Sequence, residues 1–131
     1  MHHLVYTSTA TVLLTEADLH RQLSHWREKN ARLDVTGVLL YSEGHIMQVL
    51  EGAADTIHAL FDTIETDIRH RGVTKLADGP VSERAFADWS MRFRTVDLAE
   101  YNRFVHHMKS APTHASNLAP LLEVFMGPEL L

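Results

Sequence analysis

The chain has 131 residues, 45% of them hydrophobic, which is typical of one compact domain that buries its own core. Its 12 Lys and Arg against 17 Asp and Glu give a formal charge of −5, and this balance argues against direct binding of nucleic acid. The sequence contains no cysteine, which excludes disulfides, thiol catalysis and thiolate metal sites. It also lacks a secretory segment and any run of ~18 consecutive apolar residues, so we expect a cytoplasmic protein with no membrane partner.

The first part of the sequence predicts a strand followed by a helix. Residues 3–9 alternate between two faces, so Tyr6 and Ser8 share one face of the strand. Residues 15–18 resemble a capping box and predict a helix start. The apolar stripe of this helix consists of Leu19, Leu23 and Trp26. One further step of four reaches Asn30, so the helix directs an amide toward the core.

Two apolar runs predict a hairpin. VTGVLLY (35–41) and HIMQVLEG (45–52) read as strands, and residues 42–44 form the tight turn between them. Gln48 lies in the middle of the second strand, among aliphatic neighbours. An amide left without partners at such a position costs about 1–3 kcal/mol. We therefore expect Gln48 to be hydrogen-bonded to a specific group.

A second helix is expected from about Ala54 to His70, with Asp67 at its edge and Gly72 ending it. Its apolar stripe consists of Ile57, Leu60, Phe61, Ile64 and Ile68.

Two more strands are expected, at about 73–77 and at 89–96, with a turn at 78–80. Trp89, Met91, Phe93 and Thr95 would share one face of the last strand. The order β-α-β-β-α-β-β predicts an α+β, ferredoxin-like sandwich with one added strand.

Residues 97–131 read as a helical extension of the domain formed by residues 1–96. A first helix carries an apolar side made of Leu98, Tyr101, Val105 and Met108, and a loop at 110–117 leads to a second apolar segment at 118–126. We expect this extension to pack on the sheet face that the two earlier helices leave bare.

The ten histidines raise the question of a metal site. The pairs 2–3 and 106–107 are adjacent in sequence, and neighbouring side chains on a strand or helix point in different directions. The sequence contains no HExxH motif. We therefore expect no metal site and interpret most histidines as surface residues.

Five polar residues are predicted on, or at the edge of, apolar faces: Tyr6, Ser8, Asn30, Gln48 and Asp67. Each alone is more often structural than functional. Together they come from elements that one sheet–helix layer brings close, and a few polar groups among apolar walls are typical of a ligand pocket. No GxGxxG, GxxxxGK[ST] or GxSxG motif is present, so the residues alone predict a small-molecule binding domain and no specific ligand.

Five fragments in register resemble the BLUF family of flavin-based blue-light sensors. The resemblance covers about residues 3–96. The fragments are LVYTS (4–8), NARLDVTGVLLY (30–41), QVLEG (48–52), DIRH (67–70) and DWSM (88–91). It implies a non-enzymatic photoreceptor that binds FAD, or else FMN or riboflavin, and signals through its own oligomer or an unidentified partner protein.

The resemblance also implies roles for individual residues. Tyr6 would donate the electron and proton, and Gln48 would bridge Tyr6 and the flavin. Trp89 and Met91, on the last strand, would exchange places near the pocket or respond to its switching. The remaining cofactor-binding positions would be Ser8, Asn30, Asp67, Arg69 and His70, with Ser8 associated with hydrogen bonding around the tryptophan. Lys29 departs from the family pattern, and the sequence leaves open whether it pairs with phosphate or faces solvent.

Two other classes of protein compete with the photoreceptor. One is a flavin-dependent redox enzyme on the same scaffold, although the sequence shows no obvious base for a substrate. The other is a dimeric scaffold whose inward polar residues are only structural.

Overall fold

A computed structural model describes residues 1–11 and 15–110. The elements are β1 (His2–Ala10), α1 (Glu16–Arg32), β2 (Thr36–Ser42), β3 (His45–Gly52), α2 (Ala54–Thr66), β4 (His70–Pro80), β5 (Arg92–Thr95) and α3 (Leu98–Ser110). This order confirms the α+β, ferredoxin-like arrangement with an added strand and a helix after it. The apolar segment expected at 118–126 and nearly all of the loop at 110–117 lie outside the described residues.

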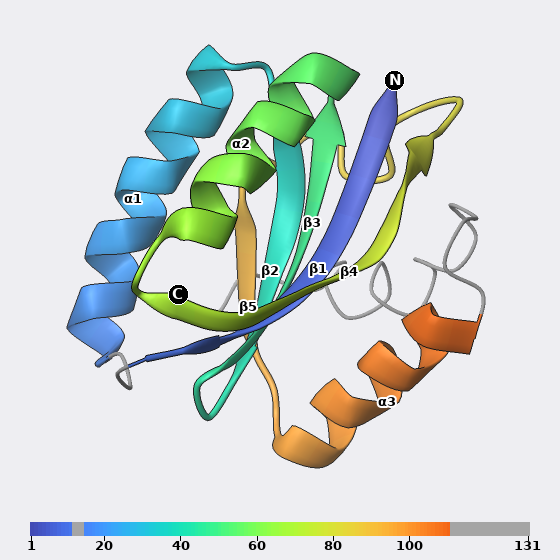
Figure 1. The fold of residues 1–131 in the computed structure, drawn as a ribbon. Helices are drawn as coiled ribbons and strands as arrows, with labels where there is room; N and C mark the ends of the chain where they lie inside the picture. Colours follow the sequence, from blue (N-terminus) through green and yellow to red (C-terminus); the bar gives the residue numbers. More distant parts are fainter. Residues whose placement is uncertain (12–14, 111–131) are drawn as a thin grey trace.

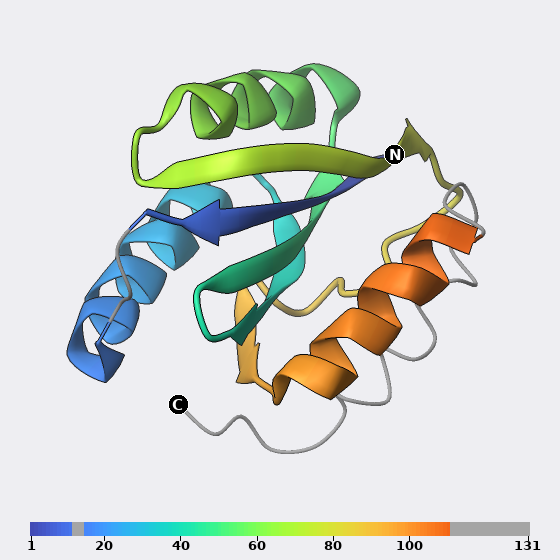
Figure 2. The ribbon, with the colours of Figure 1, turned by 60° about the horizontal axis from the view of Figure 1, so that its bottom comes forward.

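The five strands form one sheet in the order β4-β1-β3-β2-β5. β1 runs antiparallel to both β3 and β4, while β2 pairs antiparallel with β3 and parallel with β5. In Figure 1, α1 and α2 cover one face of this sheet. Figure 2 shows α3 on the opposite side, so the described part of the chain has three layers.

Each face of the sheet has its own apolar cluster, because alternate strand residues point to opposite sides. Leu4 of β1 and Leu50 of β3 pack with α1 and α2. Val5 and Val49, one position along each strand, pack with α3. The placement of the C-terminal helix on the face opposite the first two helices is therefore confirmed for the described residues.

The buried side of α3 differs in part from its expected stripe. Tyr101 and Met108 are buried, and Val105 packs against them. Phe104, which the expected stripe omitted, is also buried, whereas Leu98 at the first turn is 37% exposed. None of the described helices has the length and apolarity needed to cross a bilayer.

Helix α1 begins as expected. Thr15 Oγ1 accepts from the backbone N–H of Asp18, and the Asp18 carboxylate accepts from the N–H of Thr15. These reciprocal bonds satisfy two donors that a helix start otherwise leaves without partners.

The second half of the chain departs from the expected boundaries. Helix α2 ends at Thr66, four residues early, and Ile68 is 89% exposed, so Ile68 does not continue the apolar stripe. The expected turn at 78–80 is wrong: these residues extend β4, because β1 continues far enough to pair with them, from His2↔Pro80 to Leu4↔Asp78. A proline is tolerated at the end of such an edge strand.

The last strand is also shorter than expected, with only residues 92–95 in β5. Trp89 and Met91 therefore precede the strand. They do not share a face, because Trp89 packs with the α3-side cluster and Met91 with the cluster under α1 and α2.

Candidate functional site

A cleft opens between α1, α2 and the sheet face that they cover. It contains about 590 Å³ of empty space, part of it open to solvent. Apolar side chains supply much of the wall, and polar groups from α1, β1, β3 and the α2–β4 connection complete it. The lining residues are Tyr6, Trp26, Lys29, Asn30, Leu39, Gln48, Leu50, Leu60, Thr63, Ile64, Asp67, Arg69 and His70.

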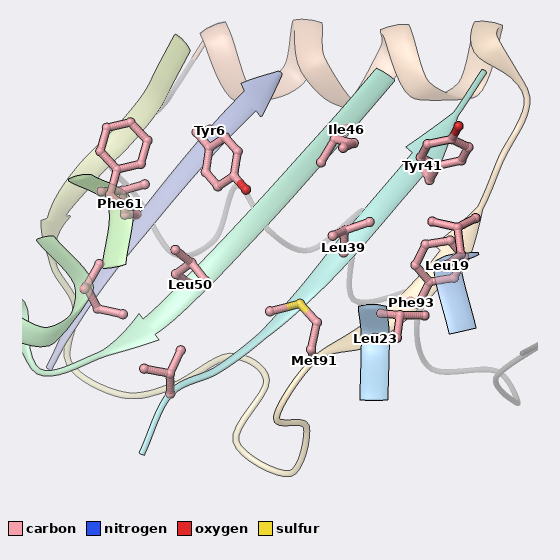
Figure 3. Packing of buried hydrophobic residues seen from close by; sticks show 13 residues of the cluster. Tyr6, Leu19, Leu23, Leu39, Tyr41, Ile46, Leu50, Phe61, Met91 and Phe93 are labelled. Carbon is pink, nitrogen blue, oxygen red and sulfur yellow. The ribbon is translucent and has the colours of Figure 1, made fainter. Parts of the chain in front are cut away.

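Tyr6 and Gln48 form the polar centre of this cleft. Residue pairing in the antiparallel β1–β3 ladder places them directly opposite one another, so their side chains share one face. The Tyr6 hydroxyl donates to Gln48 Oε1, and both residues are almost fully buried. Figure 3 shows the Tyr6 hydroxyl directed toward β3. The sequence expectation that Gln48 has a specific partner is therefore confirmed.

Burial is the main reason that the pKa of Tyr6 lies well above its ordinary value, with smaller contributions from electrostatic interactions with Asp67 and Tyr101. The phenol therefore stays protonated across the physiological range. A neutral phenol can donate its hydrogen bond to Gln48 without burying a charge.

The other end of the Gln48 amide contacts Met91. Gln48 Nε2 donates to Met91 Sδ across 3.3 Å. A thioether is a weak acceptor, so this end of the amide is held less firmly than the Tyr6 end. Figure 3 shows Met91 beside Leu39 on the same side of the sheet as Tyr6. Sequence reasoning placed Met91 near the pocket but did not predict this contact.

Helix α1 holds the segment that carries Met91. Asn30, which is 4% exposed, donates from Nδ2 to the carbonyl of Ser90 at 2.9 Å, and Arg27 Nε donates to the carbonyl of Met91 at 2.8 Å. The predicted inward position of Asn30 is confirmed. Arg27 was not predicted, because its position beside the apolar stripe of α1 is also typical of a solvent-exposed cation.

The α2–β4 connection forms the charged rim of the cleft. The Asp67 carboxylate accepts from the Arg69 side chain through Nε and Nη2, at 3.0 and 2.6 Å, and from the Arg69 N–H at 2.9 Å. These bonds, with the side-chain contact as the largest cause, lower the pKa of Asp67 to about 2 despite opposing desolvation. Asp67 therefore stays ionised.

Ser8 contacts His70 and not Trp89. Ser8 Oγ lies 3.0 Å from His70 Nδ1, and burial lowers the pKa of His70. The expectation that Ser8 organises hydrogen bonds around the tryptophan is not met in this geometry, because Trp89 lies on the opposite sheet face.

Trp89 is outside the cleft. Its ring stacks on Phe86 with centroids 5.8 Å apart, and the Arg92 guanidinium lies 4.3 Å from the Trp89 centroid. The Trp89 carbonyl accepts from the N–H of Gly37 at 2.9 Å, which fastens the segment to β2. Of the two residues singled out near the fifth strand, only Met91 approaches Gln48.

A buried glutamate anchors the same segment from the far face. Glu51 is 1% exposed, and its carboxylate accepts from the N–H groups of Ala85 and Phe86 at 2.6 and 3.0 Å and from Thr36 Oγ1 at 3.0 Å. Arg84 bonds Thr36 Oγ1 and the Glu51 carbonyl. Sequence reasoning missed this network, although a glutamate inside the apolar run HIMQVLEG was a usable signal.

Fold and cleft together define an α+β small-molecule binding domain with a neutral hydrogen-bonded pair at the centre of its site. The family model described as "BLUF: Sensors of blue-light using FAD" matches residues 1–92. The chain belongs to the BLUF family, whose members bind a flavin and sense blue light.

Among curated relatives, a photoactivated adenylate cyclase subunit beta of Euglena longa is 35% identical over 96 residues. That match covers 72% of this chain and 11% of the relative, so the chain spans only a small part of the length of the curated relatives that it matches.

Two solved structures support the same assignment. The dark state of BlrB, a BLUF protein, is 30% identical with a TM-score of 0.71, and the match covers 93% of this chain and 92% of that one. BlrP1 of Klebsiella pneumoniae, solved with FMN and cyclic diGMP, is 32% identical with a TM-score of 0.67, covering 72% of this chain and 25% of BlrP1. BlrB is a BLUF protein and the adenylate cyclase subunit is photoactivated, and none of these relatives supports the alternative of a flavin-dependent redox enzyme.

Proposed function

We propose that the cleft between α1, α2 and the sheet holds the flavin ring, and that the bound flavin in the cell is FAD. FMN and riboflavin share that ring and would fill the same space. The proposed binding residues are Tyr6, Ser8, Asn30, Gln48, Asp67, Arg69 and His70.

The chemistry of the lining supports this proposal. A flavin ring is flat and aromatic, and one edge carries alternating carbonyl acceptors and an N–H donor. Leu50 and Ile64 supply apolar wall, while the amides of Asn30 and Gln48 each offer both a donor and an acceptor. Lys29 and Arg69 contribute positive charge to the lining, which suits a ligand that carries phosphate groups.

We infer that Tyr6 and Gln48 form the light-driven switch. Bound flavin supplies the absorption of blue light and an excited state that accepts an electron. Tyr6 is an oxidisable phenol, and its proton becomes strongly acidic once an electron has left the ring. The hydrogen bond to Gln48 Oε1 gives that proton a path to the amide.

Gln48 suits the second half of the switch because an amide can reverse or tautomerise its hydrogen bonding without changing charge. In the reversed arrangement Nε2 points toward Tyr6, so the phenol O–H no longer donates to Oε1, the Tyr6 oxygen accepts from Nε2 instead, and the weak bond to Met91 Sδ is lost. Because no buried charge is created, the new arrangement can persist after the light is removed. This Tyr6–Gln48–Met91 chain is the observation that carries the proposed mechanism.

We further propose that residues 1–96 are the sensor and residues 97–131 its output extension, and that the chain itself has no enzymatic activity. The residues proposed for the switch lie between positions 6 and 91, on the α1–α2 side of the sheet. Helix α3 covers the other side. The light signal would then pass to a partner protein or to another copy of the chain.

The test is an absorption experiment on the full chain loaded with FAD. Blue light should shift the flavin absorption band slightly to the red, and the shift should reverse in the dark. No covalent adduct should form, since the chain has no cysteine. A loaded protein whose spectrum is unchanged by light, or is bleached without dark recovery, would contradict the proposed function.

A further inference from the structure

We propose that His2, His58 and Asp78 form a binding site for a divalent cation of the zinc class. The three residues come from β1, α2 and β4, elements far apart in the sequence. Their ligand atoms, one from each side chain, all lie within 4.8 Å of one another. Figure 1 shows the start of β1 beside the end of β4, and Figure 2 shows α2 running along β4.

The donor atoms already converge on one point. His2 Nε2 lies 2.5 Å from Asp78 Oδ1, and His58 Nε2 lies 2.8 Å from the same oxygen. In a tetrahedral zinc site with bonds of about 2.0–2.1 Å, the ligand atoms lie about 3.3 Å apart. A cation between the three groups would therefore require both ring nitrogens to move back from Oδ1. That displacement is within reach of side-chain rotation, because His58 is about half exposed.

Asp78 accepts hydrogen bonds on both of its carboxylate oxygens. Lys75 Nζ bonds Oδ2 at 2.9 Å, whereas both imidazoles approach Oδ1. A cation would thus meet one carboxylate oxygen, with Lys75 orienting the carboxylate from behind, as outer partners of metal ligands commonly do.

The composition of the site selects the class of cation. Two imidazoles and one carboxylate are a ligand set found around Zn²⁺, with water completing the fourth position. Ca²⁺ and Mg²⁺ prefer sites built from oxygen atoms. Binding would displace the two protons that the rings now direct at Oδ1, because a ring nitrogen that ligates a cation carries no proton.

Sequence spacing hides this site, which explains why none was expected. The argument against adjacent histidines holds for His2 and His3. His3 is buried, and as the next residue of the same strand its side chain points to the opposite face of the sheet from that of His2. The partner of His2 is instead His58 of α2, brought close by the fold, with the two ring centroids 4.8 Å apart. A bound cation would join α2 to the two strands at this edge.

The experiment is isothermal titration calorimetry of ZnCl₂ into the full chain, purified without a histidine tag and freed of metal with a chelator. The parent should bind one equivalent of Zn²⁺. His58→Gln should weaken that binding by about 10-fold or more, since even the loss of an outer partner costs about 10–100-fold. His25→Gln is the matched control, because His25 is an exposed histidine of the other helix.

A second variant, His2→Gln, approaches the same site from β1 and should lose the same binding event. Zinc should also raise the thermal midpoint of the parent and of His25→Gln, because a ligand that binds only the folded state stabilises it. The midpoint of His58→Gln should rise less than that of the parent at the same zinc concentration. Absence of a one-to-one event in the parent, unchanged affinity in His58→Gln, or an equal loss in His25→Gln would each overturn the proposal.

Discussion

Gln48 Nε2 lies 3.3 Å from Met91 Sδ, and this contact ties the middle of β3 to the segment that leads into β5. The same amide accepts from Tyr6 at its other end. Any rearrangement of Gln48 therefore alters both a strong oxygen–oxygen hydrogen bond and a weak sulfur contact. A change in the oxygen–oxygen bond alters the hydrogen bonding of the Tyr6 phenol. A change in the sulfur contact frees or restrains the backbone around Met91.

Replacing Tyr6 separates flavin binding from switching. Tyr6→Phe removes the hydroxyl but keeps the ring, which lies 5.6 Å from the Phe61 centroid. We expect the variant to remain yellow and to lose the light-induced red shift, because phenylalanine has no readily oxidised phenol and no proton to give to Gln48. Absorption spectra before and after blue light measure this. Normal photocycling by Tyr6→Phe would refute the role of Tyr6.

Asn30 and Lys29 make a matched pair for testing the binding mode. Asn30 is buried and donates to the Ser90 carbonyl, whereas Lys29 is only partly buried at the cleft. Loss of a buried polar partner costs about 1–3 kcal/mol, which corresponds to roughly 5- to 150-fold in Kd. We expect Asn30→Ala to weaken FAD binding by this amount and Lys29→Ala by less. The reverse ranking of measured dissociation constants would move the ring away from the end of α1.

Glu51 should stabilise the fold from outside the cleft. Its carboxylate accepts from two backbone N–H groups, and Glu51→Gln would place an amide NH₂ where one of the oxygens accepted. Hydrogen bonds to charged groups contribute about 1.5–3 kcal/mol, so we expect a loss of that order in the free energy of unfolding, measured in urea. Glu83→Gln, an exposed neighbour in the same segment, should change stability little. Equal stability of the parent and Glu51→Gln would show that Glu51 does not anchor this segment.

Asp67 gives a pH dependence with a definite sign. Its folded pKa of about 2 lies below the ordinary value of 3.8, so ionised Asp67 stabilises the folded state above that ordinary value. The contribution is lost as the pH falls from about 4 toward 2. Asp67→Asn should therefore lose stability relative to the parent at about pH 6, and this loss should be clearly smaller at about pH 3. Asp62→Asn, on the exposed side of α2, provides the control. The same difference in free energy of unfolding between parent and Asp67→Asn at both pH values would contradict this prediction.

How far the sequence predicts the fold depends on how local the deciding interactions are. The capping box at Thr15 and the spacing from Leu23 to Asn30 are local, and both predictions are confirmed. The turn expected at Asp78 to Pro80 is wrong because pairing with a long β1 overrides the turn preference of those residues. The length of β4 is set by the length of β1, its pairing partner, and the local sequence of β4 does not contain that information.

The site divides in the same way. Alternation along β1 and β3 is enough to put Tyr6 and Gln48 on inward faces, and the fold then aligns them in register. Trp89 and Met91 have the spacing of one strand face, yet they precede β5 and point to opposite sides. The irregular backbone before β5 is held by bonds that Arg27 and Asn30 donate and by a bond that Glu51 accepts. These partners come from distant elements, so spacing within 89–96 could not reveal the outcome.

Output should reach α3 through β3. The residues on either side of Gln48 in this strand, Met47 and Val49, pack in the cluster under α3. In addition, the Tyr101 hydroxyl of α3 donates to the carbonyl of Ile46 at 2.8 Å, two residues before Gln48. A rearranged Gln48 side chain would shift the strand that both contacts share.

We therefore expect light to change amide hydrogen exchange in β5 and in α3 more than in the hairpin turn at 42–44. Hydrogen exchange of dark and illuminated full chain, followed by mass spectrometry, measures this peptide by peptide. Tyr101→Phe should keep the red shift of the flavin absorption band, because it removes only the hydrogen bond to Ile46. It should reduce the light-dependent change in hydrogen exchange of α3. A coupling of a few kcal/mol is enough to shift a two-state population usefully. Equal protection of residues 92–110 in both states would place the signal's exit elsewhere, and α1, which carries Asn30, would be the next element to test.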